Sequence, residues 1–181
     1  NVKNFAVEVI DQKSTIAIVS SINHPDIGAL KRSIETNAQR KVILAKPNEL
    51  DKLNEVSVLV LYQPNSAFKA IFDNNKLAGT NTFIITGTNT DFNFLNQKQN
   101  NLVFKMSGQR EDYLNEFQSQ FNLFAIENIG FENFPPLQNL FGTITTNGNV
   151  SVLLSSKIRN ISTNAPLLAF AENQGKRTAF L

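Results

Sequence analysis

Short apolar runs separated by amphipathic segments dominate the first half of the chain, and this alternation most constrains its fold. The apolar runs begin at residues 15, 41, 56 and 82 and read TIAIVSS, KVILAKP, VSVLVLYQP and TFIITG. The intervening segments, such as NHPDIGALKRSIETN and NSAFKAIFDNNKLAG, have apolar residues at helical spacing. Strands that alternate with helices favour parallel pairing with right-handed crossovers. We therefore expect a three-layer α/β domain of Rossmann or flavodoxin type with a mostly parallel sheet.

The first amphipathic segment has a well-marked helix start. Asn23 is predicted to cap this helix, and Pro25 suits its first turn. Asp26 places a negative charge at the positive end of the helix dipole. The polar residues just before this helix are therefore expected to follow directly on the end of the first strand.

The second half of the chain begins with a further predicted helix. Its sequence is REDYLNEFQSQF, residues 110–121, and helical spacing would bring Tyr113, Leu114 and Phe117 together. This helix would precede the strands that complete the domain.

Turn signals follow in the C-terminal third. Asn147 and Gly148 form a strong hairpin signal, and the Asn-Gln-Gly sequence at 173–175 forms a weaker one. We expect antiparallel C-terminal hairpins that extend or flank the parallel sheet.

The chain is long enough for one domain with a sizeable core. We interpret residues 1–13 as a linker or strand from a preceding domain and residues 14–181 as a single α/β domain. The chain starts at Asn1 without a methionine and ends within an apparent strand. We therefore expect it to be a piece of a longer protein, with the domain truncated at its C-terminal end.

Composition narrows the classes of function. The 17 Lys and Arg residues are scattered, and the net charge is only +2, so no nucleic-acid partner is expected. No run of about 20 apolar residues is present, so any membrane attachment would lie outside this chain. The chain has no cysteine, which excludes a thiol nucleophile, a thiolate metal site and a disulfide. No nucleotide-binding glycine motif is present, and we expect neither a cofactor nor a metal.

Polar residues cluster after three of the predicted strands. In open α/β sheets, ligands bind outside the carboxyl ends of the strands. We therefore predict a crevice formed by SSINHPD, YQPNS and TGTNTDFN. Its candidate residues are Ser21, His24, Asp26, Gln63, Asn65, Thr88, Asn89 and Asp91.

This crevice allows more than one interpretation. His24 is the only histidine, so a hydrolase would have to pair it with Ser20, Ser21 or Thr88 as nucleophile. In the alternative interpretation His24 is structural and packs at a helix N-terminus. A third possibility is a small-ligand binding domain that uses the same crevice. The sequence NTDFN is unlike a calcium loop, because Phe94 and Asn100 stand where that loop requires Gly and Glu.

Several segments together resemble one family. NHPDIGALKRSIETN resembles the start of a class I glutamine amidotransferase-like domain found in large membrane-anchored proteins of Bacteroidetes, often beside von Willebrand factor A-like or immunoglobulin-like regions. FPPLQNLFG and TNAPLLAFAENQGKRTAFL are similar to later segments of that group. The resemblance implies an amidotransferase-like fold, an upstream immunoglobulin-like domain and an extracytoplasmic, periplasmic location.

The chain departs from this family at the catalytic residues. Class I amidotransferases carry a cysteine in a G-x-C-x-G turn after a central strand, and the similar stretch here is 87–90. Asn89 stands where the cysteine would be, and no histidine follows His24. The resemblance therefore implies a non-catalytic domain that acts as an interaction or scaffold module, with protein partners in the cell envelope.

Overall fold

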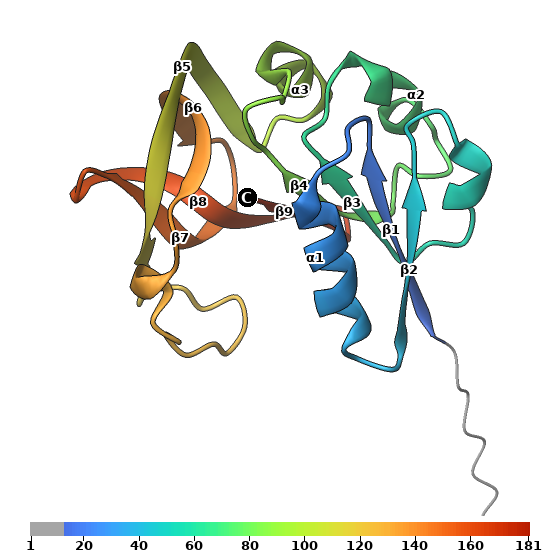
Figure 1. Ribbon diagram of the computed structural model, residues 1–181, viewed down its shortest axis with the longest axis horizontal. Helices are drawn as coiled ribbons and strands as arrows, with labels where there is room; N and C mark the ends of the chain where they lie inside the picture. The colour runs from blue at the N-terminus through green and yellow to red at the C-terminus, as the bar shows by residue number, and fades with distance from the viewer. Residues whose placement is uncertain (1–12) are drawn as a thin grey trace, which may run out of the picture.

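A nine-stranded mixed sheet runs through the whole of the computed structural model, which describes residues 13–181 (Figure 1). The strand order is β2-β1-β3-β4-β9-β8-β7-β5-β6. The linker or strand expected for residues 1–13 lies almost entirely outside the described residues. Within residues 13–181, no helix has both the length and the apolar character needed to cross a membrane.

The parallel half of the sheet contains the four strands that the apolar runs predicted. Their bounds are β1 (Ser14–Ser20), β2 (Arg40–Ala45), β3 (Val58–Tyr62) and β4 (Asn81–Ile85). A fifth strand, β9 (Lys176–Phe180), joins β4 in parallel from the end of the chain. Strands β1 and β3 are buried along most of their length, which explains why they read as continuous apolar runs.

Helices cover both faces of this half, so it has the expected three layers. On one face, α1 (Pro25–Glu35) packs the apolar stripe Ile27, Leu30 and Ile34 against the sheet. The other face is covered by η1 (Leu50–Leu53), η2 (Ser66–Phe68), α2 (Lys69–Phe72) and α3 (Phe92–Lys98). Phe68 and Leu95 are fully buried there.

The other half of the sheet is antiparallel and forms a twisted ribbon beside the helix-covered half (Figure 1). Its strands are β5 (Leu102–Phe117), β6 (Leu137–Thr146), β7 (Val150–Ile158) and β8 (Ile161–Asn173). Four of the eight neighbouring strand pairs are antiparallel, and they involve the longest strands. The expectation of a mostly parallel sheet is therefore wrong. Strands β7 and β8, and strands β8 and β9, are joined by two-residue turns, which cannot supply the crossover that parallel pairing needs.

The helix predicted for residues 110–121 is also wrong, because most of this segment belongs to β5. Tyr113 and Asn115 are buried while their neighbours are more exposed, which is the two-residue period of a strand. Leu114 therefore faces away from Tyr113 rather than sharing its side. The first part of β5 pairs with β6 and its end pairs with β7, so contacts distant in sequence decide the conformation.

The two hairpin signals have different outcomes. Gln174 and Gly175 adopt positive φ angles of 50° and 81° and join β8 to β9, as predicted. Gly148 also has a positive φ, of 75°, but β5 lies between β6 and β7, so the predicted hairpin at Asn147 and Gly148 does not form. A two-residue turn that was not predicted, at 159–160, joins β7 to β8.

Candidate functional site

A cavity of about 370 Å³ lies where the carboxyl ends of the parallel strands meet the antiparallel ribbon. Polar residues come from the start of α1 and from the ends of β3 and β4. The ribbon supplies a largely apolar wall. The apolar lining residues are Ile85, Leu102, Phe104, Pro136, Leu137, Ile144, Pro166, Leu167, Ala169, Phe180 and Leu181.

His24 and Asp26 meet the hydroxyl group of Tyr62 at one end of the cavity. His24 is the N-cap of α1, and its Nδ1 atom accepts a hydrogen bond from the backbone N–H of Asp26 at 3.3 Å. The cap is therefore His24 and not Asn23, whose Oδ1 atom accepts a hydrogen bond from Lys46. The Tyr62 hydroxyl donates to Asp26 Oδ2 at 2.9 Å and lies 2.9 Å from His24 Nδ1. The only histidine is thus held by a helix start and a phenol.

The environment of Tyr62 keeps its hydroxyl protonated. Burial raises the pKa of Tyr62 to about 12, with Asp26 adding to the rise and the nearby Gln63 amide opposing it. The side chain is only 2% exposed. At neutral pH this group is therefore a hydrogen-bond donor and not a phenolate base.

Gln63 follows β3 in a strained conformation. Its φ angle is +48°, which is uncommon for a residue other than glycine, and it is 6% exposed. Its Oε1 atom accepts hydrogen bonds from the backbone N and the Nδ2 atom of Asn89, at 2.8 and 3.1 Å. A Cβ atom added to Gly87 would lie 2.6 Å from Gln63 Cδ. The turns after β3 and β4 are therefore closely packed and hydrogen-bonded to each other.

The turn after β4 is held by its own hydrogen bonds. The Gly87 N–H donates to Thr90 Oγ1 at 2.9 Å, and Asp91 caps α3 by accepting from the Phe94 N–H at 2.9 Å. Asn89 does not have a positive φ angle. A nucleophile in an α/β-hydrolase stands on a strained strand-to-helix turn. Here the strained residue after a strand is Gln63, and the amides at Gln63 and Asn89 are not nucleophiles.

The structure brings together half of the predicted crevice residues. The residues that line the cavity are His24, Asp26, Gln63 and Thr88. Asn89 and Asp91 instead hold the turn after β4. Asn65 donates from Nδ2 to Ser21 Oγ at 3.0 Å, and neither of these two residues lines the cavity.

Two of the three hydroxyl groups proposed as nucleophiles, those of Ser20 and Ser21, have other partners. The Ser20 hydroxyl donates to the Ile22 carbonyl at 2.8 Å, and Ser21 accepts from Asn65. Among residues 13–181, no hydrogen bond joins His24 to a serine or threonine side chain. The hydroxyl–imidazole contact that a hydrolase would need is not formed.

The wall supplied by the ribbon is not among the predicted parts of the crevice. Tyr113 from β5 and Ser156 from β7 line the cavity, and Asn139 from β6 donates from Nδ2 to Thr86 Oγ1 at 3.0 Å. The alternation of LVFKM at the start of β5 is the signal that could have indicated this strand. Within the described part of the chain, no group of three or more His, Cys, Asp or Glu residues could hold a metal ion.

These features define a mixed α/β domain with a cavity at the carboxyl edge of its parallel strands. No protein-family model matches the chain, and no curated protein matches it either. Among solved structures, it is similar to a putative ThuA-like protein from Bacteroides uniformis ATCC 8492. That similarity covers 100% of this chain and 85% of the other, with 14% sequence identity and a TM-score of 0.47.

Proposed function

We propose that this chain is a non-catalytic interaction module. In this proposal it belongs to the extracytoplasmic, periplasmic part of a membrane-anchored protein and binds protein partners in the cell envelope. The location follows from the sequence resemblance to amidotransferase-like domains of such proteins. Two features of the site and the surface support the functional part of the proposal.

The first feature is the chemistry at the ends of the strands. The positions that follow β3 and β4 carry the amides of Gln63 and Asn89, and the chain has no cysteine. His24 is held as a helix cap, and the Tyr62 phenol remains protonated at neutral pH. A covalent mechanism needs a nucleophile with a base in reach, and within residues 13–181 no serine or threonine hydroxyl is hydrogen-bonded to His24.

The second feature is an exposed apolar surface, and it carries the proposal. The segment 118–136 connects β5 to β6 and contains only one short turn of helix, η3 (Phe131–Asn133). We define the apolar patch as the exposed large apolar residues of this segment: Leu123, Phe124, Ile126, Ile129 and Phe134. Ile129 is 67% exposed and Leu123 is 52% exposed. Large apolar side chains that are exposed together on one segment are typical of an interaction site.

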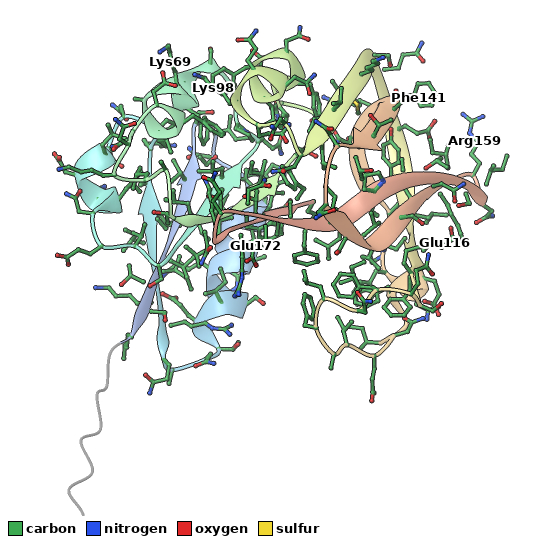
Figure 2. The ribbon with its side chains drawn as sticks, turned by 180° about the vertical axis from the view of Figure 1, so that it is seen from behind. Lys69, Lys98, Glu116, Phe141, Arg159 and Glu172 are labelled. Carbon is green, nitrogen blue, oxygen red and sulfur yellow. The ribbon has the colours of Figure 1, made fainter. Side chains whose placement is uncertain are left out.

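Aromatic side chains pack against the residues of the patch, and this packing favours a surface with a defined shape. Phe124 packs edge-on against Phe121 and Phe170, with ring centroids 4.9 and 5.3 Å apart. Phe131 packs between Phe117 and Phe134. In Figure 2 this segment lies below the ribbon near Glu116, far from Lys69 and Lys98 in the helix-covered half. Aromatic packing of this kind holds a surface in shape before a partner arrives.

The test is affinity capture from detergent-solubilised cell envelope with three baits. The baits are the wild-type chain, a patch variant (Leu123→Ser with Ile129→Ser) and a crevice variant (His24→Ala with Asn89→Ala). We expect one partner that the wild-type and crevice baits retain and the patch variant loses. A partner held equally by all three baits, or lost only with the crevice variant, would contradict the assignment of the patch.

A further inference from the structure

The cavity beside Gln63 has the chemistry of a small-molecule site, separate from the apolar patch. We propose that it binds a small, uncharged, largely apolar molecule that carries a carbonyl oxygen. The Gln63 amide would donate a hydrogen bond to that oxygen, and the apolar wall of the ribbon would hold the rest of the molecule. This proposal does not depend on the interaction role of the patch.

The orientation of the Gln63 amide is fixed by its neighbour. A backbone N–H can only donate, and the N–H of Asn89 lies 2.8 Å from Gln63 Oε1. The oxygen of the amide therefore faces Asn89, and the Nε2 group with its two N–H donors faces the other way. At most one of these donors can point at the nearby Tyr62 oxygen, which leaves at least one for a ligand.

The free donor is reachable from the cavity. One Nε2 donor is within hydrogen-bonding reach of the Tyr62 oxygen, and this contact opposes the rise in the pKa of Tyr62. Within residues 13–181, no other hydrogen bond joins Gln63 Nε2 to a protein acceptor. Gln63 lines the cavity, so its second Nε2 donor is available to a molecule bound there. A buried amide that keeps one open donor in an apolar cavity is a binding group.

The backbone around Gln63 maintains this arrangement at a cost in conformational strain. The positive φ of Gln63 is unfavourable for a side chain other than glycine, and Gly87 leaves just enough room for the amide. Strained residues that the surrounding structure holds in place gather at ligand sites. Gln63 therefore combines a strained backbone, a fixed amide orientation and an available N–H donor.

Charge and size narrow the class of ligand. The lining contains no lysine or arginine, and its one carboxylate side chain, that of Asp26, is at an exposed position. A phosphate or carboxylate would lose its hydration without gaining a cation, so an uncharged molecule fits better. The labelled cationic residues of Figure 2, Lys69, Lys98 and Arg159, lie on other parts of the molecule. A volume of about 370 Å³ is within the range of small-molecule sites.

The experiment compares two probes of nearly the same shape, acetophenone and ethylbenzene, of which only the first has a carbonyl oxygen. Each is titrated into the ¹⁵N-labelled 181-residue chain while amide chemical shifts are recorded. We expect both probes to shift the amides of Gly87 and Thr88. Acetophenone should bind about fivefold more tightly, which is the effect of one hydrogen bond.

Three variants make the comparison specific. Gln63→Met should retain ethylbenzene binding and lose the preference for acetophenone. Leu167→Trp should fill the cavity from β8 and weaken both probes at least tenfold. Phe124→Ser, which alters only the apolar patch, should change neither. The proposal is overturned by shifts that map to the patch, by equal affinity of the two probes, or by a preference that survives Gln63→Met. If Gln63→Met does not fold, unchanged binding by Leu167→Trp overturns it as well.

Discussion

The contact between Gly87 and Gln63 gives the sharpest test of the site geometry, through the variant Gly87→Ala. An added Cβ atom would lie 2.6 Å from Gln63 Cδ, 2.8 Å from Nε2 and 2.9 Å from Oε1. These distances are too short, so the amide would have to move and release the two hydrogen bonds from Asn89. Each such bond contributes about 1 kcal/mol net.

The expected sign is opposite to the usual effect of this substitution. Replacing glycine by alanine at an unstrained position stabilises a protein by about 0.4–1 kcal/mol. We therefore expect Gly87→Ala to lower the free energy of unfolding by a net of about 1–1.5 kcal/mol. Gly79→Ala is the matched control, because a Cβ atom there would meet nothing within 4 Å. That variant should be neutral or slightly stabilised.

Urea unfolding followed by circular dichroism measures both effects. A double-mutant cycle with Gln63→Ala then isolates the contact, because the second substitution removes the group that blocks the alanine. On that background Gly87→Ala should no longer destabilise. The reasoning is refuted if Gly87→Ala behaves like Gly79→Ala, or if its cost is the same with and without the Gln63 side chain.

Two further predictions concern the ribbon and the phenol. At Gly142 a Cβ atom would lie 2.3 Å from the Lys105 carbonyl oxygen. Gly142→Ala should therefore lower the free energy of unfolding, measured in urea, by about 1–3 kcal/mol. An unchanged unfolding midpoint would contradict the packing of β5 against β6. The pKa of Tyr62 is raised from 10 to about 12 in the folded state, so its contribution to stability is complete below pH 10 and is lost as the pH rises towards 12. Thermal unfolding across this range should show that loss, and Tyr62→Phe should reduce it; an equal loss in the variant would assign the effect to other groups.

Local sequence signals were sufficient to predict a strand where its residues are buried along most of their length. The run at β3 is buried on both faces of the sheet, so Val58–Tyr62 reads as a strand without reference to its neighbours. The rule that ligand sites lie beyond the carboxyl ends of parallel strands predicted that His24, Gln63 and Thr88 would lie close together, and all three line one cavity.

Local signals failed where pairing partners are distant in sequence. The segment around Tyr113 has apolar residues at spacings that suit a helix, but Leu137 and Leu154 lie on the strands that pair with β5. Gly148 forms the left-handed turn that its sequence indicates, yet the strand inserted beside it comes from residues 102–117. Pairing between strands that are distant in sequence cannot be predicted from a short stretch of sequence.

The same reason explains the incomplete prediction of the site. The wall of the cavity depends on how the ribbon folds back against β4, and the Asn139–Thr86 hydrogen bond that joins them spans 53 residues. The strain at Gln63 also has no local signal, because neither glycine nor asparagine marks that position.

The central claim is that this chain acts by binding through the apolar patch, and the affinity for its captured partner tests it most directly. The dissociation constant is measured by biolayer interferometry for the wild-type, patch and crevice chains, after circular dichroism has shown that all three are folded. Two buried apolar contacts of about 1 kcal/mol or more each predict a loss of roughly 30-fold or greater for the patch variant, with the crevice variant close to wild type. Equal affinity of the patch variant and the wild type, or a loss confined to the crevice variant, would contradict the claim.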